Sequence, residues 1–200
     1  MYTYLALGDS YTIGEQVPAA DNFPNQTTCL LRTAGVEVTD PVIIATTGWT
    51  TDELAASIRE HNILDTFSFV TLLIGVNNQY RGRSVENYEQ EFLQLLNTAI
   101  AFAAGNAHRV FVLSIPDWGV TPFAADRDRE KVANEIDAYN ASCRRISLAN
   151  GCHHLDITDS TRLHGSDGEY LVADELHPSG KEYAIWAERL TAQIKLELIK

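Results

Sequence analysis

The chain has little cysteine, few basic residues and no long apolar run. Its 200 residues include three cysteines, 15 Lys or Arg and 27 Asp or Glu, which gives a net charge of −12. Three cysteines without metal or redox spacing are typical of reduced thiols rather than of a disulfide scaffold. A surface that is negative on average repels nucleic acid, so nucleic-acid binding is not expected. No segment approaches the roughly 20 apolar residues that span a bilayer, so stable membrane insertion is not expected either.

Length and composition fit a single domain over residues 1–200. Hydrophobic residues make up 45% of the chain and charged residues 21%, values that are ordinary for a globular protein with a full core. Met1 leads straight into the first apolar run without the pattern of a signal peptide, so we expect a cytoplasmic protein. The sequence does not indicate an oligomeric state.

Short apolar runs alternate with amphipathic stretches along the chain. Five runs predict strands, at residues 2–7, 41–45, 69–75, 110–115 and 153–157. Continuous apolar runs of this length are typical of parallel strands that are covered on both faces.

Helix signals fill the intervals between these runs. Thr50 and Glu53 form a capping box at the start of one helix. Apolar residues then recur every three or four positions from Ser84 to a stop at Gly105, from the charged run 126–131 to about residue 150, and again after Gly180. The alternation predicts an α/β fold, a three-layer α/β/α sandwich with a mostly parallel five-stranded sheet of the flavodoxin-like type.

Polar or small residues follow three of the predicted strands. Ser10 follows the first strand, Gly48 the second and Asn77 the third, while Asp174 and His177 precede the last helix. Parallel strands place their carboxyl ends on one side of a sheet, which is where open α/β sheets bind ligands. We therefore expect these residues to converge on one crevice.

Their side chains are the parts of a nucleophilic triad and an oxyanion hole. A serine hydroxyl becomes a useful nucleophile when a base takes its proton, and His177 is the candidate base, with Asp174 to fix its tautomer. The backbone N–H groups of Ser10 and Gly48 and the side-chain amide of Asn77 are candidate donors to the oxyanion. The predicted catalytic residues are thus Ser10, Asp174 and His177.

The order of these residues resembles the GDSL, or SGNH, family of serine esterases and lipases. That family has Ser, Gly, Asn and His in four blocks, and this chain has Ser10, Gly48, Asn77 and His177 in the same order. Two positions depart from the family pattern: Tyr11 stands where Leu is usual, and Asn78 where Asp is usual. Neither departure removes a group with a direct chemical role.

The resemblance implies a serine hydrolase that cleaves carboxylic esters through an acyl-serine intermediate, without a cofactor or a metal. A small-molecule ester is the implied substrate, with short-chain acyl esters or acetylated carbohydrates favoured, and thioesters and lysophospholipids left open. We expect four residues that lie just after strands to line the substrate pocket: Trp49, Asn78, Tyr80 and Trp118. Packing between loops is the alternative role for these side chains.

Two other functions remain open at this point. The segment 45–50 loosely resembles the phosphate loop of flavodoxins, which would make the chain a flavin-binding protein, although Ala45 stands where a hydroxyl is preferred. The second of these functions is that of an inactive hydrolase-like module, which binds an ester without hydrolysing it. The intact set of Ser10, Asp174 and His177 favours an enzyme over both.

Overall fold

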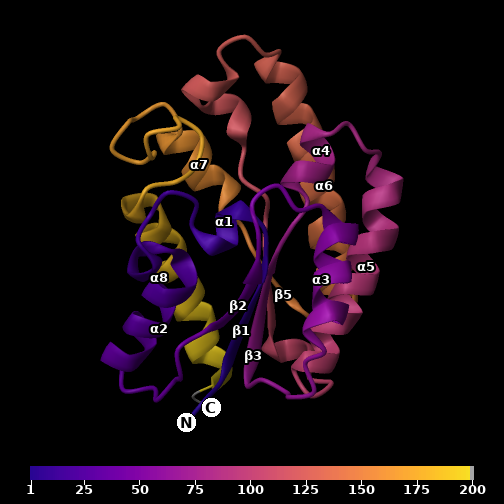
Figure 1. Cartoon of the computed structure of the whole chain (residues 1–200), viewed down its shortest axis with the longest axis vertical. Helices are drawn as coiled ribbons and strands as arrows, with labels where there is room; N and C mark the ends of the chain where they lie inside the picture. Colours follow the sequence, from indigo (N-terminus) through magenta and orange to yellow (C-terminus); the bar gives the residue numbers. More distant parts are fainter. Residues whose placement is uncertain (199–200) are drawn as a thin grey trace.

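The computed structural model describes residues 1–198, which form a parallel sheet between two layers of helices (Figure 1). The strands are β1 (Tyr4–Gly8), β2 (Val42–Ala45), β3 (Phe69–Leu73), β4 (Val110–Leu113) and β5 (His153–Leu155). They lie in the order β2-β1-β3-β4-β5, and each neighbouring pair is parallel. The predicted five-stranded parallel sheet is therefore confirmed.

The three central strands form the core of the sheet. All residues of β1, β3 and β4 are buried, which explains their continuous apolar runs. The edge strand β2 is only partly buried, with Ile44 as its one buried residue. Strands that are buried on both faces are thus the ones in which polar and apolar residues do not alternate.

Helices cover both faces of the sheet. They are α1 (Ser10–Ile13), α2 (Phe23–Thr33), α3 (Thr51–His61), α4 (Val76–Tyr80), α5 (Val85–Phe102), α6 (Arg129–Ala149), α7 (Thr158–His164) and α8 (Gly180–Leu198). Short 3-10 turns occur at η1 (Ala19–Asp21), η2 (Ala107–Arg109), η3 (Trp118–Val120) and η4 (Pro122–Ala124). In Figure 1, α2 and α8 lie on one face, and α3, α5 and α6 lie on the other.

The helices that the sequence predicts are α3, α5, α6 and α8. The capping box of Thr50 and Glu53 is present at the start of α3. Helix α6 begins at Arg129, capped by the Asp128 side chain, so only the second half of the charged run 126–131 is helical. Helices α1, α2, α4 and α7 are not among those predicted, because three of them are too short to show a period.

The strand ends and the connections that follow them create a distinct upper end of the molecule. The segment between β4 and α6 rises above the sheet at this end, beside the loop that leads from α7 to α8 (Figure 1). Within residues 1–198, no helix is long and apolar enough to cross a membrane.

Candidate active site

Ser10 opens helix α1 directly after strand β1. The Asp9 side chain caps this helix by accepting a hydrogen bond from the Tyr11 backbone N–H at 3.0 Å. The cap holds the turn from strand to helix, so the Ser10 hydroxyl lies at the upper end of the sheet. Ser10 itself is buried.

His177 and Asp174 reach Ser10 from the loop before α8. His177 Nε2 lies 2.9 Å from Ser10 Oγ, and His177 Nδ1 lies 2.7 Å from Asp174 Oδ2. A carboxylate only accepts hydrogen bonds, so Nδ1 carries the proton and Nε2 is left to accept one from the serine. The structure thus brings together three residues that are up to 167 positions apart in the sequence.

The turn that carries the acid and the base is held by its own backbone. Asp174 Oδ1 accepts hydrogen bonds from the backbone N–H groups of Leu176 and His177, both at 2.9 Å. Glu175, which lies between Asp174 and Leu176, has a positive φ of 58°, which a residue with a side chain seldom adopts. This tight turn explains the spacing Asp-x-x-His, because it lets one carboxylate bind both the backbone and the ring of the histidine.

The hydrogen bonds also decide the charge of Asp174. Burial by itself would raise the pKa of this carboxyl, but the bonds from His177 and Leu176 outweigh burial and lower the pKa below its ordinary value. Asp174 is therefore ionised at neutral pH and favours the Nδ1–H tautomer of the ring. Gln16, which the sequence did not single out, donates a further hydrogen bond to Asp174 Oδ2 at 3.2 Å.

Asn77 lies on α4, immediately after β3. Gly75 caps this helix with a φ of 132°, and a Cβ at this position would lie 2.6 Å from the ring of Tyr88. Only glycine fits both constraints, and the turn it permits directs Asn77 toward Ser10 and β2. The Asn77 Nδ2 group donates to the carbonyl oxygen of Trp49 at 3.0 Å and to Asp9 Oδ2 at 3.4 Å.

Gly48 follows β2 and has a φ of 84°. A Cβ there would meet nothing closer than Arg81 Nη2 at 3.8 Å, so the backbone conformation rather than crowding favours glycine at this position. The Gly48 carbonyl accepts a hydrogen bond from Arg81 at 2.6 Å. Arg81 thereby ties the loop after β2 to the end of α4.

Asp9 is the titratable group in this site that sequence reasoning underrated. Asp9 is not among the predicted site residues, yet its carboxylate also contacts Asn77, which follows another strand. Asp9 is completely buried, and this burial raises its pKa to about 7, against the opposing effect of the bonds from Tyr11 and Asn77. No sequence signal distinguishes this carboxylate from an ordinary helix cap.

A cavity of about 210 Å³ lies in front of Ser10 and His177. The residues that line it are Ser10, Tyr11, Thr47, Gly48, Val76, Asn77, Tyr80, Trp118, Phe123, Leu176 and His177. Apart from the polar groups near Ser10, these walls are mainly aromatic and aliphatic. We refer to this cavity as the catalytic pocket.

Two of the four expected pocket residues line the catalytic pocket, and the other two do not. Tyr80 and Trp118 form one wall, with their rings 5.3 Å apart in an edge-to-face arrangement. The expectation for Asn78 is wrong, because its buried amide is bonded to the backbone and the hydroxyl of Thr51 instead. The expectation for Trp49 is also wrong, since its side chain packs against the core and only its carbonyl reaches Asn77.

The missed wall residues come from several parts of the chain. Tyr11 and Leu176 are sequence neighbours of Ser10 and His177, and that adjacency is the one signal that could have indicated them. Phe123 comes from the connection between β4 and α6, where its backbone N–H bonds the Glu175 carbonyl at 3.2 Å. No periodic pattern in the sequence predicts that contact.

The family comparison covers most of the chain. A model described as the GDSL-like Lipase/Acylhydrolase family matches residues 6–185, which include Ser10, Gly48, Asn77, Asp174 and His177. No curated protein matches the chain significantly in sequence.

Solved structures share the fold at low sequence identity. The chain is similar to TesA (17% identity, 98% of this chain and 99% of that chain covered, TM-score 0.77). It is similar to the lipase/acylhydrolase from Enterococcus faecalis (20% identity, 98% and 97% covered, TM-score 0.75). It is also similar to Axe2, an acetylxylan esterase from Geobacillus stearothermophilus (17% identity, 96% and 94% covered, TM-score 0.76).

Proposed function

Because the chain belongs to the GDSL-like lipase/acylhydrolase family and is a hydrolase, we propose that it cleaves carboxylic esters through an acyl-serine intermediate on Ser10. One observation carries the proposal: Ser10 Oγ lies 2.9 Å from His177 Nε2, and His177 is bonded in turn to Asp174. A nucleophile, a base and a group that orients the base, each within hydrogen-bond reach of the next, are what acyl transfer needs.

In the first half of the reaction, Ser10 Oγ attacks the ester carbonyl while His177 Nε2 takes the hydroxyl proton. The carbonyl oxygen becomes an oxyanion, which the backbone N–H groups of Ser10 and Gly48 and the side chain of Asn77 stabilise. Collapse of this intermediate breaks the bond to the alcohol, which leaves with the proton from His177. Asp174 remains ionised and stabilises the imidazolium that forms in between.

The second half repeats the chemistry with water. His177 takes a proton from a water molecule that attacks the acyl-serine, and it returns the proton to Ser10 Oγ as the carboxylic acid leaves. Overall, the reaction consumes one ester and one water molecule and releases one alcohol and one carboxylic acid. No step calls on a metal or a cofactor.

The size of the catalytic pocket supports a short acyl group. Its volume of about 210 Å³ lies below the roughly 300 Å³ at which pockets for drug-sized ligands begin. Aromatic walls such as Tyr80 and Phe123 suit an acetyl or other short acyl chain and leave little room for a long one. Short-chain acyl esters and acetylated carbohydrates are therefore the proposed substrates.

The test combines covalent labelling with a panel of esters. A fluorophosphonate probe should label the wild type at Ser10 and leave Ser10→Ala unlabelled. p-Nitrophenyl esters of increasing chain length should be hydrolysed fastest at two to four carbons, and the rate should be unchanged in excess EDTA. A colourless protein would weigh further against flavin binding; no labelling and no hydrolysis would instead favour an inactive binding module.

A further inference from the structure

A polar groove leads away from the catalytic pocket along α6. It consists of two adjoining cavities of about 370 and 620 Å³, which share Gln79, Gly82, Asp128, Lys131 and Glu135 in their walls. The smaller cavity also shares Tyr80 and Trp118 with the catalytic pocket. We call these two cavities the α6 groove; it adjoins the catalytic pocket at the Tyr80 and Trp118 side chains, which line both.

The wall between the pocket and the groove is fixed by a chain of hydrogen bonds. Trp118 Nε1 donates to Gln79 Oε1 at 2.7 Å, and Gln79 Nε2 donates to Glu135 Oε2 at 2.7 Å. Gln79 is only 5% exposed, so its amide has little freedom to turn. The Trp118 indole, which lines the catalytic pocket, is thereby linked through Gln79 to a carboxylate that lines the groove.

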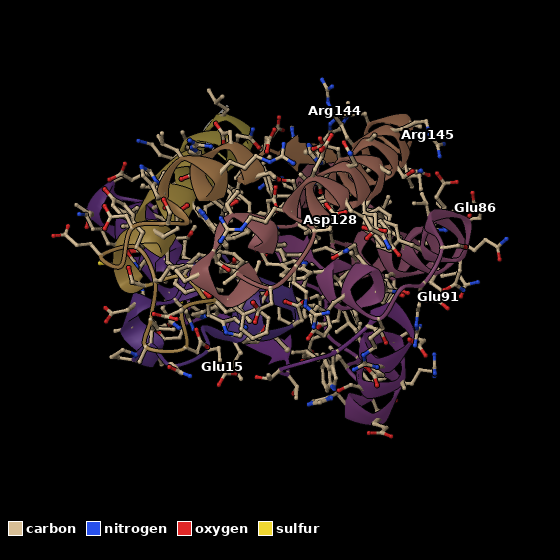
Figure 2. The ribbon with its side chains drawn as sticks, turned by 90° about the horizontal axis from the view of Figure 1, so that it is seen from above. Glu15, Glu86, Glu91, Asp128, Arg144 and Arg145 are labelled. Atoms are coloured by element: carbon tan, nitrogen blue, oxygen red, sulfur yellow. The ribbon has the colours of Figure 1, made fainter. Side chains whose placement is uncertain are left out.

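The chemistry of the groove differs from that of the catalytic pocket. It is lined by three basic and four acidic side chains: Arg83, Arg127 and Lys131 against Asp126, Asp128, Glu130 and Glu135. Figure 2 looks down on this end of the molecule and shows Asp128 where α6 begins. Because charges of both signs nearly balance, the groove favours neither a polyanion nor a polycation. A fatty chain is also a poor ligand, since it would remove these charged groups from water without offering them hydrogen bonds.

The groove also offers neutral polar groups and an aromatic ring. Asn134 and Ser84 add an amide and a hydroxyl to its walls. Tyr80 is 47% exposed at the junction with the catalytic pocket, and Arg127 lies 5.9 Å above its ring. A neutral ligand with many hydroxyl groups can bind such a surface. Each hydroxyl can donate a hydrogen bond to a carboxylate and accept one from an amide or a cation, beside the aromatic ring.

We propose that the α6 groove binds the sugar units of a neutral acylated oligosaccharide whose ester group lies at Ser10. This inference rests on the proposed function for the catalytic pocket, and it names the alcohol part of the substrate. The short acyl group occupies the apolar pocket in front of His177, and the chain of sugar units extends past Tyr80 toward Lys131 and Glu135. The two adjoining volumes exceed that of the catalytic pocket, as a leaving group larger than the acyl group requires.

Obstruction of the groove tests the proposal. Ala138 is an exposed residue of α6 that lines the larger cavity, so Ala138→Trp places an indole in it. The matched control is Leu148→Trp, a 52% exposed position ten residues further along the same helix, about 15 Å away. Lys131→Ala is a second, smaller change that removes one polar partner without filling the groove.

Hydrolysis of acetylated xylo-oligosaccharides of one to four units gives the first measurement. For the wild type and Leu148→Trp, kcat/KM should rise at least tenfold from one unit to four. Ala138→Trp should abolish this rise and Lys131→Ala should reduce it about threefold, while both keep kcat/KM for p-nitrophenyl acetate within twofold. A wild type that does not distinguish one unit from four, or a rise that survives Ala138→Trp, would overturn the proposal.

Calorimetric titration with unacetylated xylotetraose separates this proposal from the proposed function. Binding to the wild type that weakens at least tenfold in Ala138→Trp supports the groove whether or not the protein hydrolyses esters. An active esterase that fails to bind xylotetraose would refute the groove and leave the catalytic proposal standing. Binding without any hydrolysis or labelling would refute catalysis and leave the groove.

Discussion

The two sides of the catalytic pocket differ in how their polar groups are paired before any substrate arrives. On one side, Ser10, His177 and Asp174 are linked by hydrogen bonds of 2.9 and 2.7 Å. On the other side, the Asn77 amide donates to the Trp49 carbonyl at 3.0 Å and to Asp9 at 3.4 Å. The amide that is expected to bind the oxyanion is therefore already bonded to other protein groups.

This difference matters for the order of events. The proton path from Ser10 to His177 is already aligned, so the nucleophile is prepared in the free protein. An oxyanion that binds Asn77 has to replace one of its present partners, and the longer contact to Asp9 is the weaker one. The first side is thus ready for proton transfer, while the second is completed by the substrate.

The largest effect is expected on the prepared side. Ser10→Ala or His177→Ala should lower kcat for a short-chain ester by at least about 10⁴-fold, because residues of a triad act as a unit. Steady-state kinetics on p-nitrophenyl acetate measures the loss, and the melting temperature should change little. Ser166→Ala, at an exposed serine that does not line the catalytic pocket, is the matched control. Substantial activity without the Ser10 hydroxyl would remove the nucleophile from the mechanism.

A smaller loss is expected on the oxyanion side. Asn77→Ala should lower kcat by about 10²- to 10³-fold, the usual cost of one oxyanion donor, with KM nearly unchanged. Asn97→Ala, at an exposed position on α5, should leave kcat at its wild-type value. If kcat stays the same in Asn77→Ala, the amide never leaves Trp49 and Asp9, and Ser10 and Gly48 alone stabilise the oxyanion.

The pH dependence of stability tests the buried carboxylate on the same side. The pKa of Asp9 is about 7 in the folded protein, against an ordinary value of 3.8, so between these values the folded state holds a proton that the unfolded state releases. Its contribution to stability is therefore full below about pH 4 and is lost as the pH rises through 7.

Asp9→Asn should remove that loss. Relative to the wild type, the variant should gain stability between pH 4 and pH 8, by up to about 4 kcal/mol. The introduced side-chain amide would face the amide of Asn77, and any loss of stability from this contact is the same at every pH. It therefore does not alter the trend. Denaturant unfolding of both proteins at pH 4, 6 and 8 measures it. A constant difference between them across this range would show that Asp9 does not titrate there.

The smallest effect is expected at the exposed edge of the triad. Gln16 donates to Asp174 from the solvent side at 3.2 Å, and exposed hydrogen bonds contribute about 0.5–1 kcal/mol. Gln16→Ala should therefore lower kcat by no more than about fivefold. A hundredfold loss in stopped-flow or steady-state assays would mean that Asp174 depends on Gln16 as much as on its own turn.

The sheet and the triad were predictable for the same physical reason. Buried parallel strands need continuous apolar runs, and such runs are visible in the sequence around Leu5, Val70 and Val112. Once the strands are placed, the polar residues that follow them must share one edge. This is why Ser10 and Asn77 could be assigned to one crevice without coordinates.

The pocket walls were less predictable. Asn78 is adjacent to Asn77 in the sequence, but on a helix the two side chains point about 100° apart, and Asn78 faces Thr51. Phe123 enters the pocket through a contact between two loops, which no periodicity encodes. The groove along α6 depends on the same kind of contact, through Gln79, Trp118 and Glu135.

The sequence by itself determined the layered α/β architecture and the four blocks of chemistry, since both depend on residue type and on short spacings along the chain. Only the tertiary structure decided that Asp9 contacts Asn77, that Trp49 turns toward the core and that a charged groove adjoins an apolar pocket. These features depend on side chains from distant segments that meet in three dimensions. The free energy that stabilises these contacts comes from burial and from hydrogen-bond geometry, and neither exists until the chain has folded.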